Sequence, residues 1–416
     1  MNPRLLVIMG SGETAPTMVK PHRSVFERFG TEPVQAVVLD TPYGFQANAD
    51  DISSRTVEYF SASVGRRVEV AELPRVEGAD PVRREASLAK IAAANWVFAG
   101  PGSPTYALRQ WTGTDLPELL ADKLRCGGCI VFASAAALTL GRYTVPVYEI
   151  YKVGADPVWA DGLGLLAPVL GGDVAVIPHY DNAEGGNHDT RYCYLGEWRL
   201  QALEKQMTDS GWVLGVDEHT GLIIDVDARS ATVLGNGGVT VRRRGLSAVV
   251  PSGASVTIDE LVDITSGKSP SSASPPRPSQ APLEAPRTAL HGEIRRLEDH
   301  FDKAVESSDI DSAVGCVLEL LDTLAAWSGD TTQSDAGERG QAALRRMVVR
   351  LGSLATVGAR DPREVVGVFV EGLLNERDAA RAGKRFADAD RIRELLVSSG
   401  LEVRDTAEGT EWNMNR

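Results

Sequence analysis

The sequence predicts an α/β chain: a mainly parallel sheet with helices on both faces, antiparallel strands appended to it, and a small helical domain towards the C-terminus. Three observations carry this prediction. Short apolar runs alternate with helix-period segments in the first half of the chain, as in βα units. Valine and isoleucine runs separated by Asp, Gly and Asn turns follow them. Beyond a stretch rich in Pro and Ser, apolar residues recur at three- and four-residue spacing.

The expected parallel strands are short runs of apolar residues, as in strands that are buried on both faces. They read RLLVIMG, VQAVVLD, ANWVFAG, CIVFAS and DVAVIPH. Helices are expected between them, for example at 50–60 and 80–94. The region from Trp212 to Arg244 has the pattern of antiparallel strands joined by tight turns.

A linker is expected at 266–286, because this segment is dense in Pro and Ser and has few large apolar residues to bury. It divides the chain into a sheet domain at 1–265 and a helical domain at 287–416. The helical domain is expected to be a small bundle that ends in a strand-like tail.

Composition narrows the classes of function. The net charge of -14 disfavours non-specific attraction to nucleic acid or anionic lipid, although it leaves room for a local RNA contact. No apolar run is long enough to cross a membrane, and the N-terminal apolar stretch is too short for a signal peptide, so we expect a cytoplasmic protein. The sequence is compatible with a homo-oligomer.

The four cysteines do not suggest a disulfide framework. Cys126 and Cys129 form a CxxC, but this motif leads into a strand and has no second ligand pair. We therefore expect buried thiols in a Gly-Gly turn, and neither a metal nor a cofactor.

Ser134 lies where a predicted strand turns into a helix, the place where reactive groups gather in parallel sheets. It is either a nucleophile on a sharp turn or a buried serine that caps its own helix. A glycine turn at 100–102 and a histidine at the end of another strand, His179, favour the nucleophile. The three come together only if their strands are neighbours.

These segments resemble the peptidase E and cyanophycinase family of serine peptidases. PHYDNAEGGNHDTR is similar to the family's histidine segment, and FAGPGSPTYAL and FASAAAL match its glycine turn and nucleophile motif in order and spacing. The resemblance covers about residues 4 to 245. It implies the flavodoxin-like fold of class I glutamine amidotransferases and hydrolysis of a peptide or isopeptide bond, often beside an acidic residue.

The resemblance implies Ser134 as nucleophile and His179 as base. The orienting acid has two candidates: Glu149, from the region in which the family carries its aspartate, and Asp181, which would share a face with His179. His219, next to Glu218, is either a surface or a site residue.

The oxyanion donors are expected at the N–H groups of Gly102 or Ser103 and of Ala135, since Pro101 has no N–H. Two positions depart from the family, which has glycines where this chain has Phe132 and Ala136.

Three further residues are candidates for substrate binding. Asn182 is expected to fix the histidine loop, and His188 to contact substrate or loop. Arg191 would bind a substrate carboxylate or form a structural ion pair.

The end of the chain closely resembles that of cysteinyl-tRNA synthetases, over the stretch LLNERDAARAGKRFADADRIRELLVSSGLEVRDTAEGTEW and more loosely over about residues 290–412. The resemblance implies part of a helical anticodon-binding region and a tRNA partner. The synthetase catalytic signatures are absent from the sequence, so aminoacylation is not expected.

The sequence thus predicts a serine hydrolase that acts on a small peptide or amide substrate, acidic in type by the resemblance, with a tRNA-interacting accessory domain. The alternative is a catalytically inactive amidotransferase-like protein that binds a ligand or supports an RNA contact.

Overall fold

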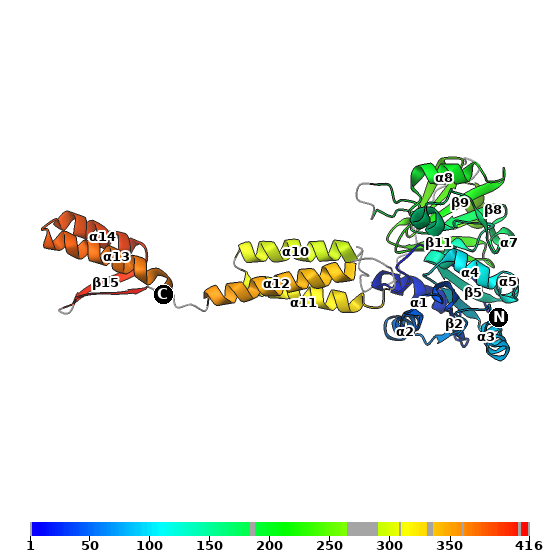
Figure 1. Cartoon of the computed structure of the whole chain (residues 1–416), viewed down its shortest axis with the longest axis horizontal. Helices are drawn as coiled ribbons and strands as arrows, with labels where there is room; N and C mark the ends of the chain where they lie inside the picture. Colours follow the sequence, from blue (N-terminus) through cyan, green and yellow to red (C-terminus); the bar gives the residue numbers. More distant parts are fainter. Residues whose placement is uncertain are drawn as a thin grey trace. The chain divides into compact units, whose positions relative to one another are not determined.

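Four of the five apolar runs expected as parallel strands lie in the main sheet of the computed structural model. The structure describes residues 2–183, 188–263, 290–307, 309–330, 336–358, 362–406 and 409–414. Within these residues the main sheet has the order β14-β11-β10-β1-β5-β4-β2-β3. Figure 1 labels three of its strands, β2, β5 and β11. Its strands are β1 (Arg4–Met9), β2 (Ala36–Leu39), β3 (Glu69–Val70), β4 (Trp96–Ala99), β5 (Gly128–Ala133), β10 (Thr220–Asp225), β11 (Ser230–Gly235) and β14 (Ser255–Thr257).

The five strands from β3 to β1 pair in parallel, and β10, β11 and β14 continue the sheet in antiparallel pairs. A parallel sheet with antiparallel strands appended is therefore confirmed. The expected helices are also present, with bounds that differ from the prediction by one residue at each end. They are α2 (Ala49–Tyr59) and α3 (Pro81–Ala93), the latter capped by the Asp80 carboxylate, which accepts from the Arg83 N–H at 3.0 Å.

A second sheet has the order β13-β12-β9-β8-β6-β7. Its strands are β6 (Tyr143–Thr144), β7 (Ala160–Asp161), β8 (Asp173–Ile177), β9 (Gly211–Val216), β12 (Gly238–Arg243) and β13 (Leu246–Pro251). The strand that precedes His179, β8, lies in this second sheet and pairs with β9 and β6. It does not pair with β5, so the condition that the serine and the histidine meet only between neighbouring strands is wrong.

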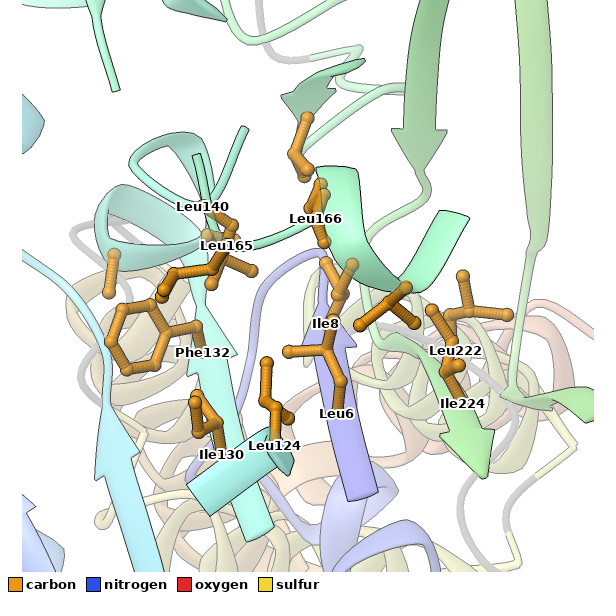
Figure 2. Close-up of a cluster of buried hydrophobic side chains, with 14 of the residues drawn as sticks. Leu6, Ile8, Leu124, Ile130, Phe132, Leu140, Leu165, Leu166, Leu222 and Ile224 are labelled. Atoms are coloured by element: carbon orange, nitrogen blue, oxygen red, sulfur yellow. The ribbon is translucent and has the colours of Figure 1, made fainter. Parts of the chain in front are cut away.

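The main sheet is buried on both faces. Alternate residues of one strand enter different cores: Ile130 and Phe132 pack with residues of α3, α4 (Pro104–Trp111) and α5 (Leu116–Cys126). Figure 2 shows this core, in which Phe132 lies on β5 and Leu6 and Ile8 on β1. The intervening residues of β5, Cys129, Val131 and Ala133, pack with residues of α1 (Val19–Glu27) and of the short helix Phe60–Val64. Helices thus cover both faces, which explains why the parallel strands have continuous apolar sequences.

The remaining helices of this part of the chain are short. They are α6 (Ser134–Leu138), α7 (Ala167–Leu170), α8 (Gly196–Glu204) and α9 (Ile258–Asp263), and single turns of helix occur at Pro16–Met18, Thr41–Tyr43 and Glu149–Val153.

Helices dominate the C-terminal part, as predicted. They are α10 (Leu290–Glu306), α11 (Ile310–Ala326), α12 (Ala336–Gly358), α13 (Pro362–Ala382) and α14 (Phe386–Ser398), followed by a hairpin of β15 (Leu401–Thr406) and β16 (Gly409–Met414). The hairpin and the last two helices share a small core that contains Leu374, Leu396 and Val403. Arg377 adds a bidentate ion pair with Asp405, whose pKa it lowers.

The chain divides into two compact units, the first of residues 1–297 and 319–340 and the second of residues 298–318 and 341–416. The expected linker at 266–286 lies outside the described residues. The proposed domain limits at 265 and 287 therefore stay predictions. None of the helices in the described ranges combines the length and hydropathy needed to span a membrane.

Candidate active site

Three chain segments leave the main sheet at one place, the carboxyl ends of β1, β5 and β4. In the parallel pairings Met9 lies beside Ala133, and Ala99 lies beside Phe132. Consequently the segment 10–13, the turn 100–102 and Ser134 all follow the ends of adjacent strands. In open parallel sheets this edge is where ligands bind.

Ser134 occupies a strained turn between β5 and α6. Ala133 is still extended, with φ -127° and ψ 153°, whereas Ser134 has φ 49°. A left-handed backbone is unfavourable for a serine by roughly 1 kcal/mol or more. It turns the chain sharply and presents the side chain at the end of the strand, which is the geometry of a nucleophile elbow.

His179 approaches Ser134 from the second sheet. It follows the end of β8, also with a left-handed φ of 48°, and its Nε2 lies 2.9 Å from Oγ of Ser134. The expected convergence of serine and histidine therefore occurs, although their strands belong to different sheets. The distance is that of a hydrogen bond between a hydroxyl and its base.

Glu218 is the acid on the other side of the imidazole. Its Oε1 lies 2.8 Å from Nδ1 of His179 and accepts from the Asn182 side-chain amide at 3.2 Å. It lies in the turn between β9 and β10. Ser134, His179 and Glu218 thus form one hydrogen-bonded chain across three segments that are distant in sequence.

Neither acid expected from the sequence occupies that position. The Asp181 carboxylate accepts from the backbone N–H of Glu218 at 2.7 Å, so it holds the turn that carries the acid. The Glu149 carboxylate accepts from the Thr105 hydroxyl at 3.1 Å. Two residues after His179 the chain has already turned, so the side chains at 179 and 181 do not share a strand face.

The electrostatics of the site favour an ionised Glu218. Burial raises the pKa of Glu218, but the hydrogen bond and charge of His179, with the Asn182 amide, outweigh it and leave the pKa below its ordinary value. Two neighbouring carboxyls shift the other way. Burial raises the pKa of Asp181, and it raises that of Asp217 to about 6.

The glycine turn after β4 packs against the serine turn. The Gly100 carbonyl accepts from the Ala136 N–H at 3.2 Å. Gly102 has φ 135°, and a Cβ there would lie 2.0 Å from the Pro42 carbonyl oxygen, so only glycine fits. The Ser103 N–H, an alternative oxyanion donor, is already bound to that carbonyl at 2.9 Å. Gly102 and Ala135 stay the predicted donors, and Ala135 lies in the first turn of α6, where N–H groups have no acceptor within the helix.

The two departures from the family's glycines are accommodated without displacing the serine. Phe132 is fully buried in the core on the α5 side of the sheet, with its ring centroid 5.9 Å from that of Trp111. Ala136 is fully buried as well, and its N–H makes the bond to Gly100. The extra side-chain volume is therefore taken up in the hydrophobic core.

The expected substrate residues have different surroundings. Asn182 is buried and bound to Glu218, so it supports the acid. His188 is exposed, with its ring 6.5 Å from that of Tyr151. Arg191 forms a bidentate pair with Asp189 at 2.8 Å, the structural alternative considered for it. His219, left open by the sequence, is half-buried, with its ring edge-on to that of Trp327 and bound to the Thr17 hydroxyl at 2.9 Å.

The sequence did contain a signal for the missed acid. Asp217, Glu218 and His219 separate two strands that are almost entirely buried, and so polar a turn between buried strands is an obvious place for site residues. Among the residues that the structure describes, no group of three or more His, Cys, Asp or Glu side chains could hold a metal ion.

Comparison with known proteins gives two kinds of similarity. No protein-family model matches the chain. Among solved structures, it is similar to a peptidase from an acI-B1 Actinobacterium, with a TM-score of 0.49 and 19% identity over 61% of this chain and 97% of that one. It is also similar to a putative peptidase E protein from Listeria monocytogenes EGD-e, with a TM-score of 0.35 and 13% identity over 58% and 98%.

The curated relatives are cysteine--tRNA ligases. That of Streptococcus thermophilus (strain CNRZ 1066) is 35% identical over 124 residues, 29% of this chain and 24% of the relative. That of Lachnospira eligens is 27% identical over 120 residues, 29% of this chain and 25% of the relative. The match thus spans about a quarter of these ligases. The similarity to cysteine--tRNA ligases covers a smaller share of this chain than the similarity to the two solved structures.

Proposed function

We propose that the first unit is a serine-type hydrolase of peptide or amide bonds. The observation that carries the proposal is the continuous chain from Oγ of Ser134 through His179 to Glu218, with hydrogen-bond distances of 2.9 and 2.8 Å. A serine hydroxyl is a poor nucleophile unless a base accepts its proton and a third group orients that base. The left-handed backbone of Ser134 supports the same role.

The roles follow from the chemistry of acyl transfer. Oγ of Ser134 forms a bond to the substrate carbonyl carbon while Nε2 of His179 takes its proton. The Glu218 carboxylate holds the other ring nitrogen and stabilises the imidazolium. The negative oxygen of the tetrahedral intermediate would accept from the N–H groups of Gly102 and Ala135.

His179 then gives its proton to the leaving amine as the carbon–nitrogen bond breaks. Water, activated by the same imidazole, hydrolyses the acyl-enzyme and regenerates Ser134. No oxidation state changes in these steps, and each proton taken by His179 is returned within the cycle.

Cleavage of a peptide library tests the proposal. Wild-type protein is incubated with the library and products are identified by mass spectrometry, with Ser134→Ala as the matched inactive variant. We expect cleavage by the wild type and none above background by the variant. Cleavage that persists in Ser134→Ala, or none by either protein, contradicts a serine hydrolase and favours the inactive, ligand-binding alternative.

We also propose that the second unit binds tRNA. A shallow hollow of about 420 Å³ on α12 is lined by Arg345, Arg346, Val349, Arg350 and Ser353. Guanidinium groups bind phosphates well, and the curated relatives are named for a tRNA substrate. Despite the net charge of -14, this face is locally basic.

Gel-shift titration of the full-length chain with tRNA tests this second proposal. Replacing Arg345 and Arg350 together by glutamine should weaken binding at least tenfold and reduce its dependence on salt. Equal affinity of the wild type and this variant, or no shift at low salt, contradicts it.

A further inference from the structure

Trp327 is a buried aromatic residue that directly follows α11. It is 5% exposed, whereas its neighbours Ala326 and Ser328 are exposed. Residues 319–340, which include it, belong to the first compact unit together with the two sheets. A single large buried side chain between exposed neighbours indicates that the residue packs against another part of its unit.

The segment 327–330 lies beside the chain that leaves β1. A Cβ at Gly329 would lie 3.5 Å from the Thr14 carbonyl oxygen. Burial raises the pKa of Glu13 to about 7, and the charge of Asp330 raises it further. Because β1 pairs with the strand that leads to the serine, the segment is placed at the same edge of the main sheet as the candidate active site.

Trp327 contacts His219, the residue directly after the catalytic acid. The two rings meet edge to face, with their centroids 5.5 Å apart and an interplanar angle of 76°. Nδ1 of His219 lies 2.9 Å from the Thr17 hydroxyl, and a Cβ at Gly12 would lie 2.2 Å from the same nitrogen. The imidazole is thus enclosed by two positions that follow β1 and by the tryptophan that follows α11.

The backbone of His219 is strained. Its φ is 52°, in the left-handed region, within the short turn between β9 and β10 that carries Glu218. Such a conformation costs about 1 kcal/mol or more and persists where the surrounding structure imposes it. Packing of the His219 ring is one such constraint, and it acts one residue away from the carboxylate that binds Nδ1 of His179.

We propose that Trp327 is a positioning residue for the catalytic acid: by packing on His219 it holds the turn from which Glu218 reaches His179. The inference rests on the proposed hydrolase function, and it makes that function depend on a residue beyond the predicted linker. Without the indole, the His219 ring would lose one of its contacts and the strained turn would sample other conformations. Glu218 would then hold the catalytic imidazole less often in the productive orientation.

The test measures the second-order rate constant of fluorophosphonate labelling of Ser134 in the full-length chain. Trp327→Ala should react about 10- to 100-fold more slowly than wild type, as expected when a group that supports a catalytic contact is lost. Trp327→Phe keeps an aromatic ring on His219 and should react within about threefold of wild type. Trp198→Ala removes a tryptophan that is 63% exposed and should leave the rate unchanged.

A double-mutant cycle separates positioning from a general loss of stability. If Trp327 acts through Glu218, the alanine substitution should change the rate by about threefold or less in a Glu218→Gln background. Phe132→Ala removes a buried ring elsewhere in the core, and its folded protein should keep its labelling rate. Trp327→Leu retains apolar volume but no ring, and it replaces the alanine variant in the cycle if that variant does not fold. Equal rates for wild type and the ring-deficient variant, or an equal loss in both backgrounds, overturn the inference.

Failure of the hydrolase proposal would be seen separately, by a measurement that does not need a reactive serine. The proton on Nδ1 of His179 gives a downfield proton NMR resonance when it is bound to a carboxylate, and its loss in Glu218→Gln assigns it. This resonance should broaden or vanish in Trp327→Ala and remain in Trp327→Phe. Dependence of the resonance on Trp327 without labelling of wild type retains the positioning role and rejects the hydrolase. Labelling of wild type with a resonance and rate that ignore Trp327 does the reverse.

Discussion

Nδ1 of His179 lies 2.8 Å from Oε1 of Glu218, and this contact joins the end of a strand in one sheet to a turn between the two sheets. The Asn182 amide and the Asp181 carboxylate hold the same turn, through the side chain and the backbone N–H of Glu218 respectively. The imidazole is thus oriented by an acid that is itself fixed from two directions, as expected of a base that must present Nε2 to a serine.

Glu218→Gln should slow the reaction of Ser134 strongly. The amide has the shape of the acid but cannot stabilise an imidazolium and can favour the wrong ring tautomer, a change that costs about 10²- to 10⁴-fold in serine hydrolases. The measurement is the second-order rate constant of fluorophosphonate labelling. Glu149→Gln is the matched control and should react within about threefold of wild type, because that carboxylate binds Thr105. A larger loss in Glu149→Gln than in Glu218→Gln would show that the acid has been misassigned.

The strain at Ser134 predicts an unusual order of stability between two inactive variants. Ser134→Ala and Ser134→Gly both lose the hydrogen bond to His179, but only glycine adopts a φ of 49° without steric cost. We expect the glycine variant to be more stable by about 1 kcal/mol. Urea unfolding followed by tryptophan fluorescence would measure the difference. If alanine were equally stable or more stable, the backbone at this position would not be left-handed in solution.

Phe132 should matter for stability and much less for chemistry. Its ring is fully buried in the core shown in Figure 2, so Phe132→Ala should lower the free energy of unfolding by about 3 to 5 kcal/mol. Folded variant protein should still be labelled at Ser134, since the ring packs in the core, with its centroid 5.9 Å from that of Trp111. Phe45→Ala, at a ring that is 53% exposed, should cost about 1 kcal/mol or less. A stable but unlabelled Phe132→Ala would place the ring in the catalytic machinery.

Glu13 predicts a specific pH dependence of stability. Its pKa is about 7 in the folded chain and 4.5 when unperturbed, so the folded state binds more protons between these values. The contribution of Glu13 to the free energy of unfolding therefore becomes less favourable as pH rises from about 4.5 to about 7. The total change is about 3 kcal/mol, and the contribution is constant above that range.

The measurement is the difference in unfolding free energy between wild type and Glu13→Gln across that range. Taking a difference is necessary because buried His22 also changes the stability with pH. Its pKa is lowered to about 4, so its contribution to the free energy of unfolding becomes less favourable as pH falls. The variant should gain stability relative to wild type as pH rises. A difference that stays constant with pH would mean that Glu13 is solvated or paired in solution.

Much of this architecture could be predicted because it is encoded locally. The parallel strands have continuous apolar sequences, since helices bury both their faces, and α3 begins next to a capping Asp80. Ser134 and His179 were identifiable because each directly follows such a strand. These features depend on neighbours in sequence and on the period of apolar residues.

The acid was not predictable in the same way. Glu218 reaches His179 because β9 pairs with β8 while β10 pairs with β1, which brings the turn between β9 and β10 next to both the histidine and the serine. Both pairings are long-range, and neither leaves a local pattern. The division into two sheets was missed for the same reason, as was the contact between Trp327 and His219.

The most direct test of the central claim is where a fluorophosphonate probe attaches. The full-length wild-type chain is treated at pH 8, digested, and its modified peptides are identified by mass spectrometry, with Ser134→Ala and Ser103→Ala in parallel. We expect a single modified residue, Ser134, with labelling lost in Ser134→Ala and retained in Ser103→Ala. Labelling that persists in Ser134→Ala, or an unmodified Ser134 in folded wild-type protein, would contradict it.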